Sequence, residues 1–199
     1  MDQVKPRSPQ LHGFSLVEML VVIGIIAVLT TLGVTAFGTI TKGSSMTRAG
    51  MMVGEQLGLA RQEAATSNRD VEVRFYNVVS GPDAGWTAFQ VWKVDQTPTG
   101  PVTRAHSGVF HLPLGVVIAD SALSPLVKNS TRKGADTLGT QANTPYSAFR
   151  FRANGTLERQ MSGDNYLTIV EKTETTQKPI NYFTLQIHPL TGKTTAFRP

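Results

Sequence analysis

The first third of the chain is organised around one long apolar run. Between Glu18 and Lys42 no side chain is charged, and Met19–Leu29 is apolar throughout. A helix over Met19–Thr41 would be about 35 Å long, which is enough to cross the hydrocarbon core of a bilayer. Because the run occurs once, the pattern predicts either a single-pass anchor or an export signal that is removed.

The helical pattern continues beyond this run. Small and apolar residues recur at steps of three and four positions up to Ala64, and no proline occurs between Pro9 and Pro82. We therefore expect one helix from Phe14 to about Ser67, with an apolar part over residues 14–41 and an amphipathic part over residues 42–68. Each interior glycine costs up to about 1 kcal/mol relative to alanine. Bends and local melting, or close contacts through small residues, are therefore expected at Gly33, Gly38, Gly43, Gly50, Gly54 and Gly58.

Past Asn68 the periodicity changes from helical to alternating. Val71, Val73 and Phe75 alternate with charged residues, as a half-buried strand requires. Asn154-Gly155 and Thr191-Gly192 are typical of type I′ turns, in which both central residues have positive φ. Residues 69–199 are therefore predicted to form an antiparallel β-rich head, and the chain an α+β fold. The further strands are expected at Trp86–Val94, Val109–Leu112, Gly115–Ala119, Ala148–Arg152, Leu167–Glu171, Tyr182–His188 and Thr194–Phe197.

The composition of the chain excludes several kinds of functional site. The chain has 199 residues, 40% of them hydrophobic and 17% charged, which suits one modest domain with an accessory segment. The absence of cysteine excludes a disulfide scaffold, a thiol nucleophile and cysteine-ligated zinc. A net charge of +5 does not by itself predict a surface that binds nucleic acid.

The boundary of the apolar run has an unusual charge. Residues 1–13 form a short polar segment, and Glu18 stands at the start of the apolar run. A carboxylate without a partner is energetically unfavourable at that place in a membrane. Cleavage after Gly13 would create an α-amine on Phe14. That amine is largely protonated at neutral pH and could pair with Glu18.

The segment from Gly13 to Ile23 resembles the class III signal of type IV pilins and type II secretion pseudopilins. The resemblance implies that a prepilin peptidase cuts after Gly13 and that Phe14 becomes the methylated first residue. It also implies that Glu18 pairs with a neighbouring subunit's N-terminus when pilin or pseudopilin subunits assemble through this helix. The expected location is the inner membrane, as a single-pass subunit with a periplasmic head, and later a pilus or pseudopilus.

The head carries looser likenesses to the GspH/FimT minor pseudopilins. They lie in the helix end at residues 57–64, in Leu112–Val116, and in Phe149–Phe151 followed by Asn154–Thr156. The polar stretch Asp120–Tyr146 departs from that pattern, and we interpret it as a loop inserted in the head. The chain's length and start also resemble the pilin-like "Verru_Chthon cassette" proteins.

Two alternatives remain open from the sequence. Val34-Thr35-Ala36 before Phe37 fits a general signal peptidase, which would release a secreted β-rich domain but leaves Glu18 unexplained. Some FimT-like minor pilins bind DNA through an arginine-containing C-terminal motif. The matching stretch here, Gly192–Thr195, contains Lys193 and is followed only by Arg198, and a further basic group lies at Lys128, Arg132 and Lys133. The sequence therefore favours pilin subunits over nucleic acid as partners, and DNA binding stays an open alternative.

The remaining polar residues predict no enzyme, metal or cofactor site. The four histidines, His12, His106, His111 and His188, have no ligand or nucleophile spacing. Asp164-Asn165 is better explained as a turn than as part of a calcium loop, because further spaced carboxylates are missing. The sequence also lacks the short motifs of hydrolases, metalloproteases and nucleotide-binding proteins. We therefore expect assembly rather than catalysis.

Overall fold

The computed structural model describes residues 15–158, 164–174 and 178–199, and gives only the backbone for residues 32–42. The chain divides into two compact units, Met1–Thr41 and Lys42–Pro199, and each is described by itself. Helix α1 (Leu16–Ser67) supplies nearly all of the described part of the first unit and the opening element of the second. It is helical throughout, so the expected melting at its glycines is wrong.

The second unit adds a β-rich head to the end of α1. Most predicted strands are present within two residues of their expected limits, and two are additional, β3 and β6. The described elements after α1 are β1 (Val71–Val78), β2 (Gly85–Thr97), β3 (Gly100–Ala105), β4 (Phe110–His111), β5 (Val116–Ile118), α2 (Pro125–Lys128), β6 (Arg132–Leu138), β7 (Gln141–Phe151), β8 (Tyr166–Glu171), β9 (Tyr182–Ile187) and β10 (Thr194–Phe197).

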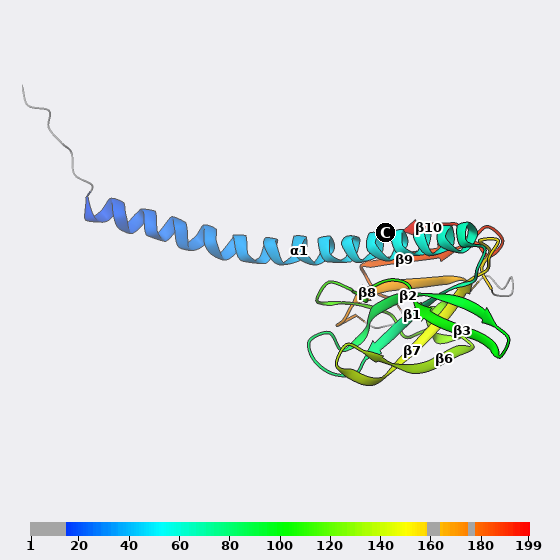
Figure 1. The fold of residues 1–199 in the computed structure, drawn as a ribbon. Coiled ribbons are helices and arrows are strands. Elements are labelled where there is room, and N and C mark those ends of the chain that lie inside the picture. Colours follow the sequence, from blue (N-terminus) through cyan, green and yellow to red (C-terminus); the bar gives the residue numbers. More distant parts are fainter. Residues whose placement is uncertain (1–14, 159–163, 175–177) are drawn as a thin grey trace, which may run out of the picture. The chain divides into compact units, whose positions relative to one another are not determined.

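The strands form two antiparallel sheets (Figure 1). One has the order β3-β2-β1-β7-β6, with β4 also pairing with β2, and the other has the order β10-β9-β8-β5. Within the second unit, α1 runs along β9 and β10 (Figure 1). One helix followed by an antiparallel head confirms the predicted α+β class.

The core lies where the helix meets both sheets. Met46, Ala49, Val53, Leu57, Ala60 and Ala64 of α1 are buried, which confirms the predicted amphipathic face. They belong to one cluster with Val71, Val73 and Phe75 of β1 and with Leu167, Leu185 and Ile187 of the other sheet. Burying a side chain of this size contributes about 1.5–3 kcal/mol, so this cluster holds helix and head together.

The polar stretch Asp120–Tyr146 is not a loop, which corrects the sequence interpretation. It contains α2 and β6, and it enters β7, whose register with β6 runs from Arg132↔Ala148 to Leu138↔Gln141. Because β6 is an edge strand with mostly exposed side chains, it shows no alternation of apolar residues. The strand β3 was missed for the same reason, since it follows a two-residue turn on the opposite edge.

The two predicted turns exist, but they are not of type I′. Gly155 (φ 77°) and Gly192 (φ 63°) have positive φ, whereas Asn154 and Thr191 do not. At the first, the Gly155 N–H donates to the Arg152 carbonyl at 2.7 Å, and at the second six residues, 188–193, connect β9 to β10. In loops longer than two residues, a single left-handed glycine is enough to redirect the strand.

Two glycines of α1 differ in what surrounds them. A Cβ on Gly50 would lie 2.3 Å from the Phe183 ring, so the close-contact interpretation holds here, against a sheet rather than another helix. A Cβ on Gly58 would meet nothing within 4 Å. Close approach therefore explains Gly50 but not Gly58.

These surroundings predict opposite effects for the same substitution. Gly50→Ala is expected to destabilise the head by about 1–3 kcal/mol, because the methyl group overpacks the core. Gly58→Ala should stabilise it by about 0.5–1 kcal/mol through helix propensity. Thermal unfolding of both variants followed by circular dichroism checks this, and equal shifts of the same sign would contradict the packing.

Among the described residues, no helix combines the length and hydropathy needed to cross a membrane. Residues 32–41 of the predicted span Met19–Thr41 lie where only the backbone is described.

Candidate functional site

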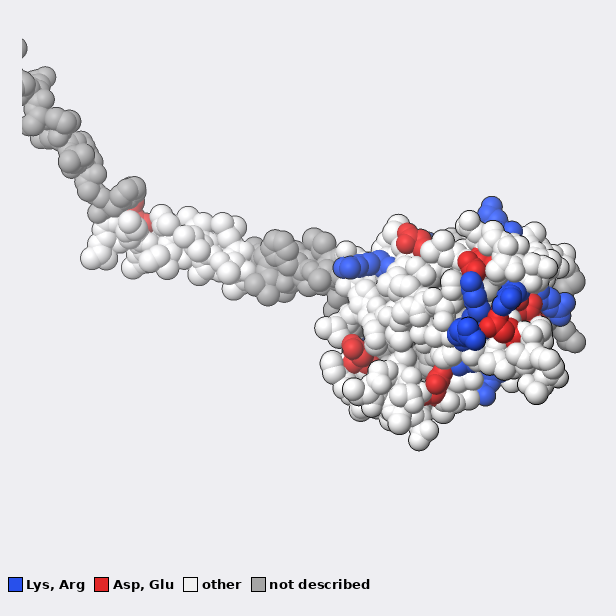
Figure 2. Space-filling model, in the orientation of Figure 1, with Lys and Arg blue, Asp and Glu red and all other residues white. Residues whose placement is uncertain are grey.

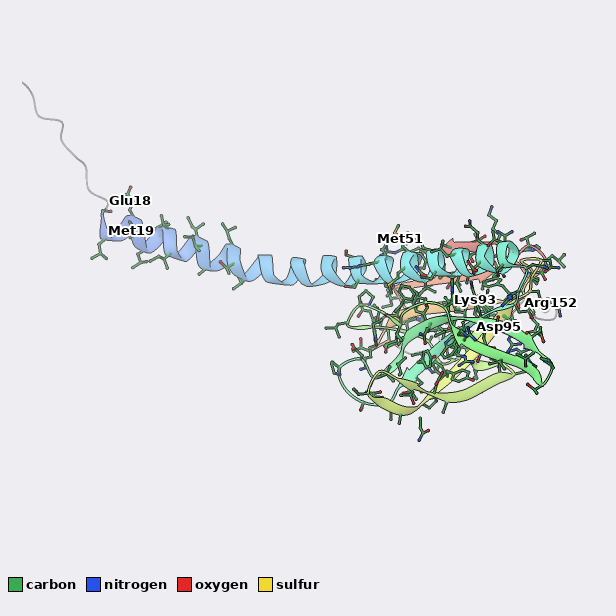
Figure 3. All side chains as sticks on the ribbon, in the orientation of Figure 1. Glu18, Met19, Met51, Lys93, Asp95 and Arg152 are labelled. Atoms are coloured by element: carbon green, nitrogen blue, oxygen red, sulfur yellow. The ribbon has the colours of Figure 1, made fainter. Side chains whose placement is uncertain are left out.

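The first turn of α1 closes with a reciprocal cap. The Ser15 N–H donates to Oε2 of Glu18 at 3.2 Å, and the Glu18 N–H donates to Oγ of Ser15 at 3.2 Å. This pair is a capping box, in which serine and glutamate three positions apart satisfy each other's backbone donors. Glu18 therefore has a partner inside its own chain, and its carboxylate is directed back toward the start of the helix (Figure 3).

The predicted cleavage site adjoins this cap. Gly13 and Phe14 lie outside the described residues, so neither the cut nor the charge pair of Phe14 with Glu18 is placed by the structure. Glu18 itself lies on the first turn of α1, three residues after Ser15. Ser15 is the residue that the sequence interpretation missed, although the Ser-x-x-Glu spacing before an apolar run was a readable signal.

Apolar side chains surround the first turns of α1. Eleven large ones between Leu16 and Leu29 are 45–83% exposed, and they point in all directions around the helix axis. In Figure 2 this part of the helix is white except for one acidic side chain, which the sequence assigns to Glu18. A helix that is apolar all round is normally covered by lipid or by other protein. The structure thus presents an uncovered apolar helix with one carboxylate at its start.

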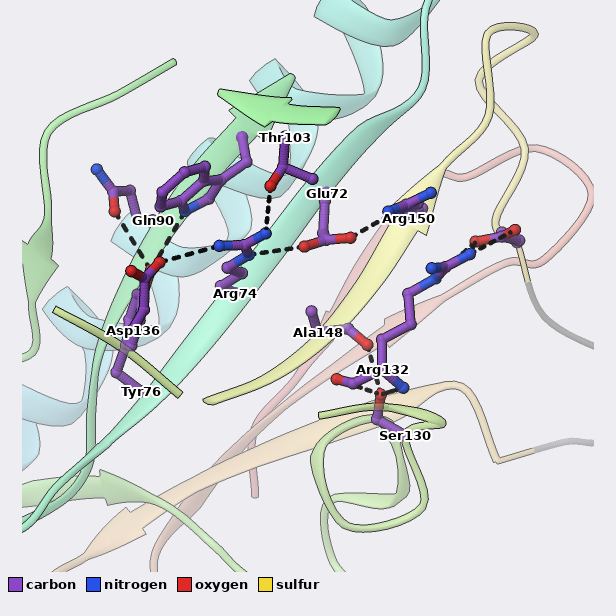
Figure 4. Close-up of polar contacts among 12 residues, drawn as sticks. Glu72, Arg74, Tyr76, Gln90, Thr103, Ser130, Arg132, Asp136, Ala148 and Arg150 are labelled. Carbon is purple, nitrogen blue, oxygen red and sulfur yellow. Dashed lines mark hydrogen bonds and ion pairs between the residues drawn. The ribbon is translucent and has the colours of Figure 1, made fainter. Parts of the chain in front are cut away.

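The head contains a buried charge network on the outer face of the first sheet (Figure 4). Glu72 bridges two arginines, with 2.7 Å from its Oε1 to Nε of Arg74 and 2.7 Å from its Oε2 to Nε of Arg150. Arg74 also donates to Oδ2 of Asp136 at 2.9 Å and to Oγ1 of Thr103 at 2.7 Å. The network joins β1, β3, β6 and β7.

Aromatic rings complete the surroundings of Arg74. Its guanidinium carbon lies 4.0 Å from the ring centre of Trp92 and 4.5 Å from that of Tyr146. Burial alone lowers the pKa of Arg74, but the hydrogen bond and charge of Glu72 outweigh it and the pKa lies above its ordinary value. Burial has the opposite effect on the nearby phenol and raises the pKa of Tyr76 to about 12. Among the described residues, no fully buried polar side-chain atom of this cluster lacks a hydrogen-bond partner, so its geometry indicates a structural role.

Most of the basic residues considered for nucleic-acid binding contact other groups of the protein. Arg132 forms a bidentate ion pair with Glu158, and Lys133 donates to the Lys128 carbonyl at 2.9 Å. They lie on α2 and β6 rather than on a loop, which corrects that expectation. Arg198 donates to Oγ1 of Thr47 and to the Gly43 carbonyl, and so ties the C-terminal segment to α1.

The described histidines lie apart from one another, and their nearest contacts are an ion pair and a turn. Nε2 of His106 lies 3.8 Å from Glu63, whose other oxygen pairs with Lys93 at 2.6 Å, and the hydrogen bond from Lys93 lowers the pKa of Glu63. His188 accepts from the Thr191 N–H within its turn, and His111 lies on β4. In the described part of the chain, no group of three or more His, Cys, Asp or Glu side chains could hold a metal.

Comparison with sequence families decides the nature of the N-terminal segment. The family described as "Prokaryotic N-terminal methylation motif" matches residues 11–34. Residues 11–34 carry a prokaryotic methylation motif. This finding confirms the resemblance of the segment to type IV pilins and pseudopilins. The motif contains Gly13, Phe14 and the Ser15–Glu18 cap.

Comparison with whole proteins adds little information on function beyond the motif. No curated protein matches the chain. Among solved structures, the minor pseudopilin EpsH from the type 2 secretion system of Vibrio cholerae is similar, with 15% identity and a TM-score of 0.45. The match covers 78% of this chain and 98% of that one. The motif at residues 11–34 and the apolar run of the helix that begins after Glu18 therefore remain the features that point to a function.

Proposed function

We propose that the chain is a minor pilin or pseudopilin, a structural subunit of a type IV pilus or a type II secretion pseudopilus. The observation that carries this proposal is the methylation motif at residues 11–34, which coincides with an uncovered apolar helix. Within that helix Glu18 is the only charge up to Thr41. Such a surface is suited to packing against identical or related helices.

The proposed life cycle has two stages. The precursor is held in the inner membrane by residues 14–41, with its head in the periplasm, and a prepilin peptidase cuts it after Gly13. The new N-terminus at Phe14 is methylated. Sister subunits then replace lipid around α1, and the Glu18 carboxylate pairs with an ammonium group of a neighbouring subunit's N-terminus. Because water is excluded from such a bundle, the ion pair fixes the register of packing.

The geometry of the head supports assembly over binding of nucleic acid. Arg132 and Arg198 are engaged within the protein, and the arginines of the Glu72 network are buried. Phosphate contacts need exposed and available cations. The head is therefore proposed to act through its shape and surface in the assembled filament.

Replacing Gly13 tests the processing step. Gly13→Leu is expected to abolish cleavage, because a bulky residue before the cut obstructs the peptidase, and the chain should retain residues 1–13. The measurement is the intact mass of the protein extracted from membranes. Gly24→Ala is the matched control, since a Cβ there meets nothing within 4 Å, and it should be processed normally. Normal cleavage of the Gly13→Leu chain would contradict the proposed site.

A further inference from the structure

We propose that the loops at one end of the head form a docking surface for the lipid headgroups of the membrane that holds the unassembled subunit. The inference rests on the proposed anchoring by residues 14–41. It adds a contact that orients the head before assembly. This loop surface consists of five exposed residues: Val79, Leu114, Lys172, Lys178 and Ile180.

Lys172 joins the loops that carry the surface. Its N–H donates to the Gly115 carbonyl at 2.9 Å, and its Nζ donates to the Pro82 carbonyl at 3.1 Å. Gly115 follows Leu114 in the connection from β4 to β5. Pro82 lies in the connection from β1 to β2, which begins at Val79. The three connections therefore lie side by side at one edge of the head.

The direction of β9 shows at which end of the head these loops lie. A Cβ on Gly50 of α1 would lie against the Phe183 ring. About one turn later, a Cβ on Gly54 would lie against Leu185. Strand β9 therefore runs in the same direction as α1, and Ile180, which precedes β9, lies toward the end at which α1 enters the head.

No linker separates this end of the head from the apolar run. The sequence without charges ends at Thr41, and the Gly43 carbonyl already accepts a hydrogen bond from Arg198 of the head at 3.3 Å. Two residues span at most about 7 Å. When residues 14–41 occupy the membrane, this end of the head is therefore held close to the headgroups.

The apolar residues of the loop surface suit the boundary between lipid and water. Val79, Leu114 and Ile180 are 69–86% exposed, although all three are large and apolar. Apolar side chains that gather on neighbouring loops mark a surface that something else covers. Here the covering partner is the bilayer, because the apolar run of the same chain ends beside these loops.

The charges at this end favour a bilayer that contains anionic lipids. Its exposed cations include Arg48, Lys172, Lys178 and Arg198. The acidic residues in and beside the same connections are partly buried, namely Asp83, Glu171 and Glu174. Lysine and arginine side chains close to an anionic membrane are attracted to it, and the attraction decays within a Debye length.

The absence of cysteine from the chain makes a direct test possible. The full-length chain, with one introduced cysteine that carries an environment-sensitive fluorophore, is placed in vesicles of equal parts phosphatidylglycerol and phosphatidylcholine, diluted so that most vesicles hold a single chain. Leu114→Cys and Ile180→Cys label the loop surface. Leu190→Cys is the matched control, because Leu190 is also apolar and 57% exposed but follows the opposite end of β9.

A lipid with a nitroxide near its headgroup quenches a fluorophore that touches the bilayer. It should quench the labels of Leu114→Cys and Ile180→Cys and spare that of Leu190→Cys. Adding Lys178→Gln to Leu114→Cys should lower the ratio of quenched to unquenched label about fivefold. Lys193→Gln, in the turn after β9, should not change it. In vesicles of phosphatidylcholine alone, Lys178→Gln should have no effect.

The possible failures point to different errors. Equal quenching of the Leu114→Cys and Leu190→Cys labels would overturn the docking surface and leave the anchoring intact. Changes at Leu114→Cys that appear only when many chains share a vesicle would assign the loop surface to sister subunits instead of lipid. A chain that does not float with the vesicles would contradict the anchoring, and with it the proposed function.

Discussion

Glu18→Val is expected to leave cleavage after Gly13 intact and to reduce incorporation into filaments by at least about tenfold. In the proposed function, the peptidase recognises the residues around the cut, whereas assembly needs the Glu18 carboxylate. Without it, each neighbour's ammonium group is buried among apolar helices with no counter-charge, and unpaired buried charges are strongly unfavourable. A tenfold loss corresponds to only about 1.4 kcal/mol, well within the range for such a charge.

The measurement compares the fraction of processed chain found in sheared filaments with the fraction that remains in the membrane. Glu55→Val is the matched control, since Glu55 is an exposed glutamate of the same helix in the second unit, and it should assemble normally. Wild-type incorporation of Glu18→Val would refute the intersubunit charge pair. An equal defect in both variants would show that loss of any acidic residue from α1 impairs assembly.

Glu72→Gln is expected to cost about 3–5 kcal/mol of folding stability, the largest effect of any single substitution considered for the head. Glu72 is almost fully buried and is the shared partner of Arg74 and Arg150. The amide cannot neutralise either guanidinium, and it accepts through only one oxygen. Removing one partner of a buried ion pair leaves the others uncompensated in a low-dielectric surrounding.

This loss should lower the unfolding temperature of the full-length chain by about 10 °C. Tryptophan fluorescence is a suitable probe, because Trp92 stacks on Arg74. Glu63→Gln is the control, since Glu63 and Lys93 are both partly exposed and such a pair contributes less than about 1 kcal/mol. Similar shifts in the two variants would mean that the Glu72 network contributes no more than a surface ion pair.

The elements with strong periodicity could be predicted from the sequence. The buried face of α1 and the inward residues of β1 follow directly from steps of three or four and of two. The edge strands β3 and β6 could not, because an edge strand with exposed side chains has no apolar alternation. Glu72 and Arg74 were expected to face solvent, but β3 and β6 bring Thr103 and Asp136 over them and bury them.

The candidate site was predictable for a different reason. Its signal is local in sequence, because the glycine, the proposed new N-terminus and the carboxylate lie within six residues, so no tertiary information was needed. The family match at residues 11–34 confirmed the resemblance of this segment to the methylation motif, and the cut and the charge pair stay predictions. The capping contact of Ser15 became visible only in the structure, where its N–H and hydroxyl bond to Glu18.

The central claim is that function begins with removal of residues 1–13, and one measurement tests it most directly. The intact mass and N-terminal residue of the wild-type protein, extracted from membranes of its own host, should correspond to a chain that starts at methylated Phe14. A chain that starts at Met1, or at Phe37 after cleavage by a general signal peptidase, would contradict the account.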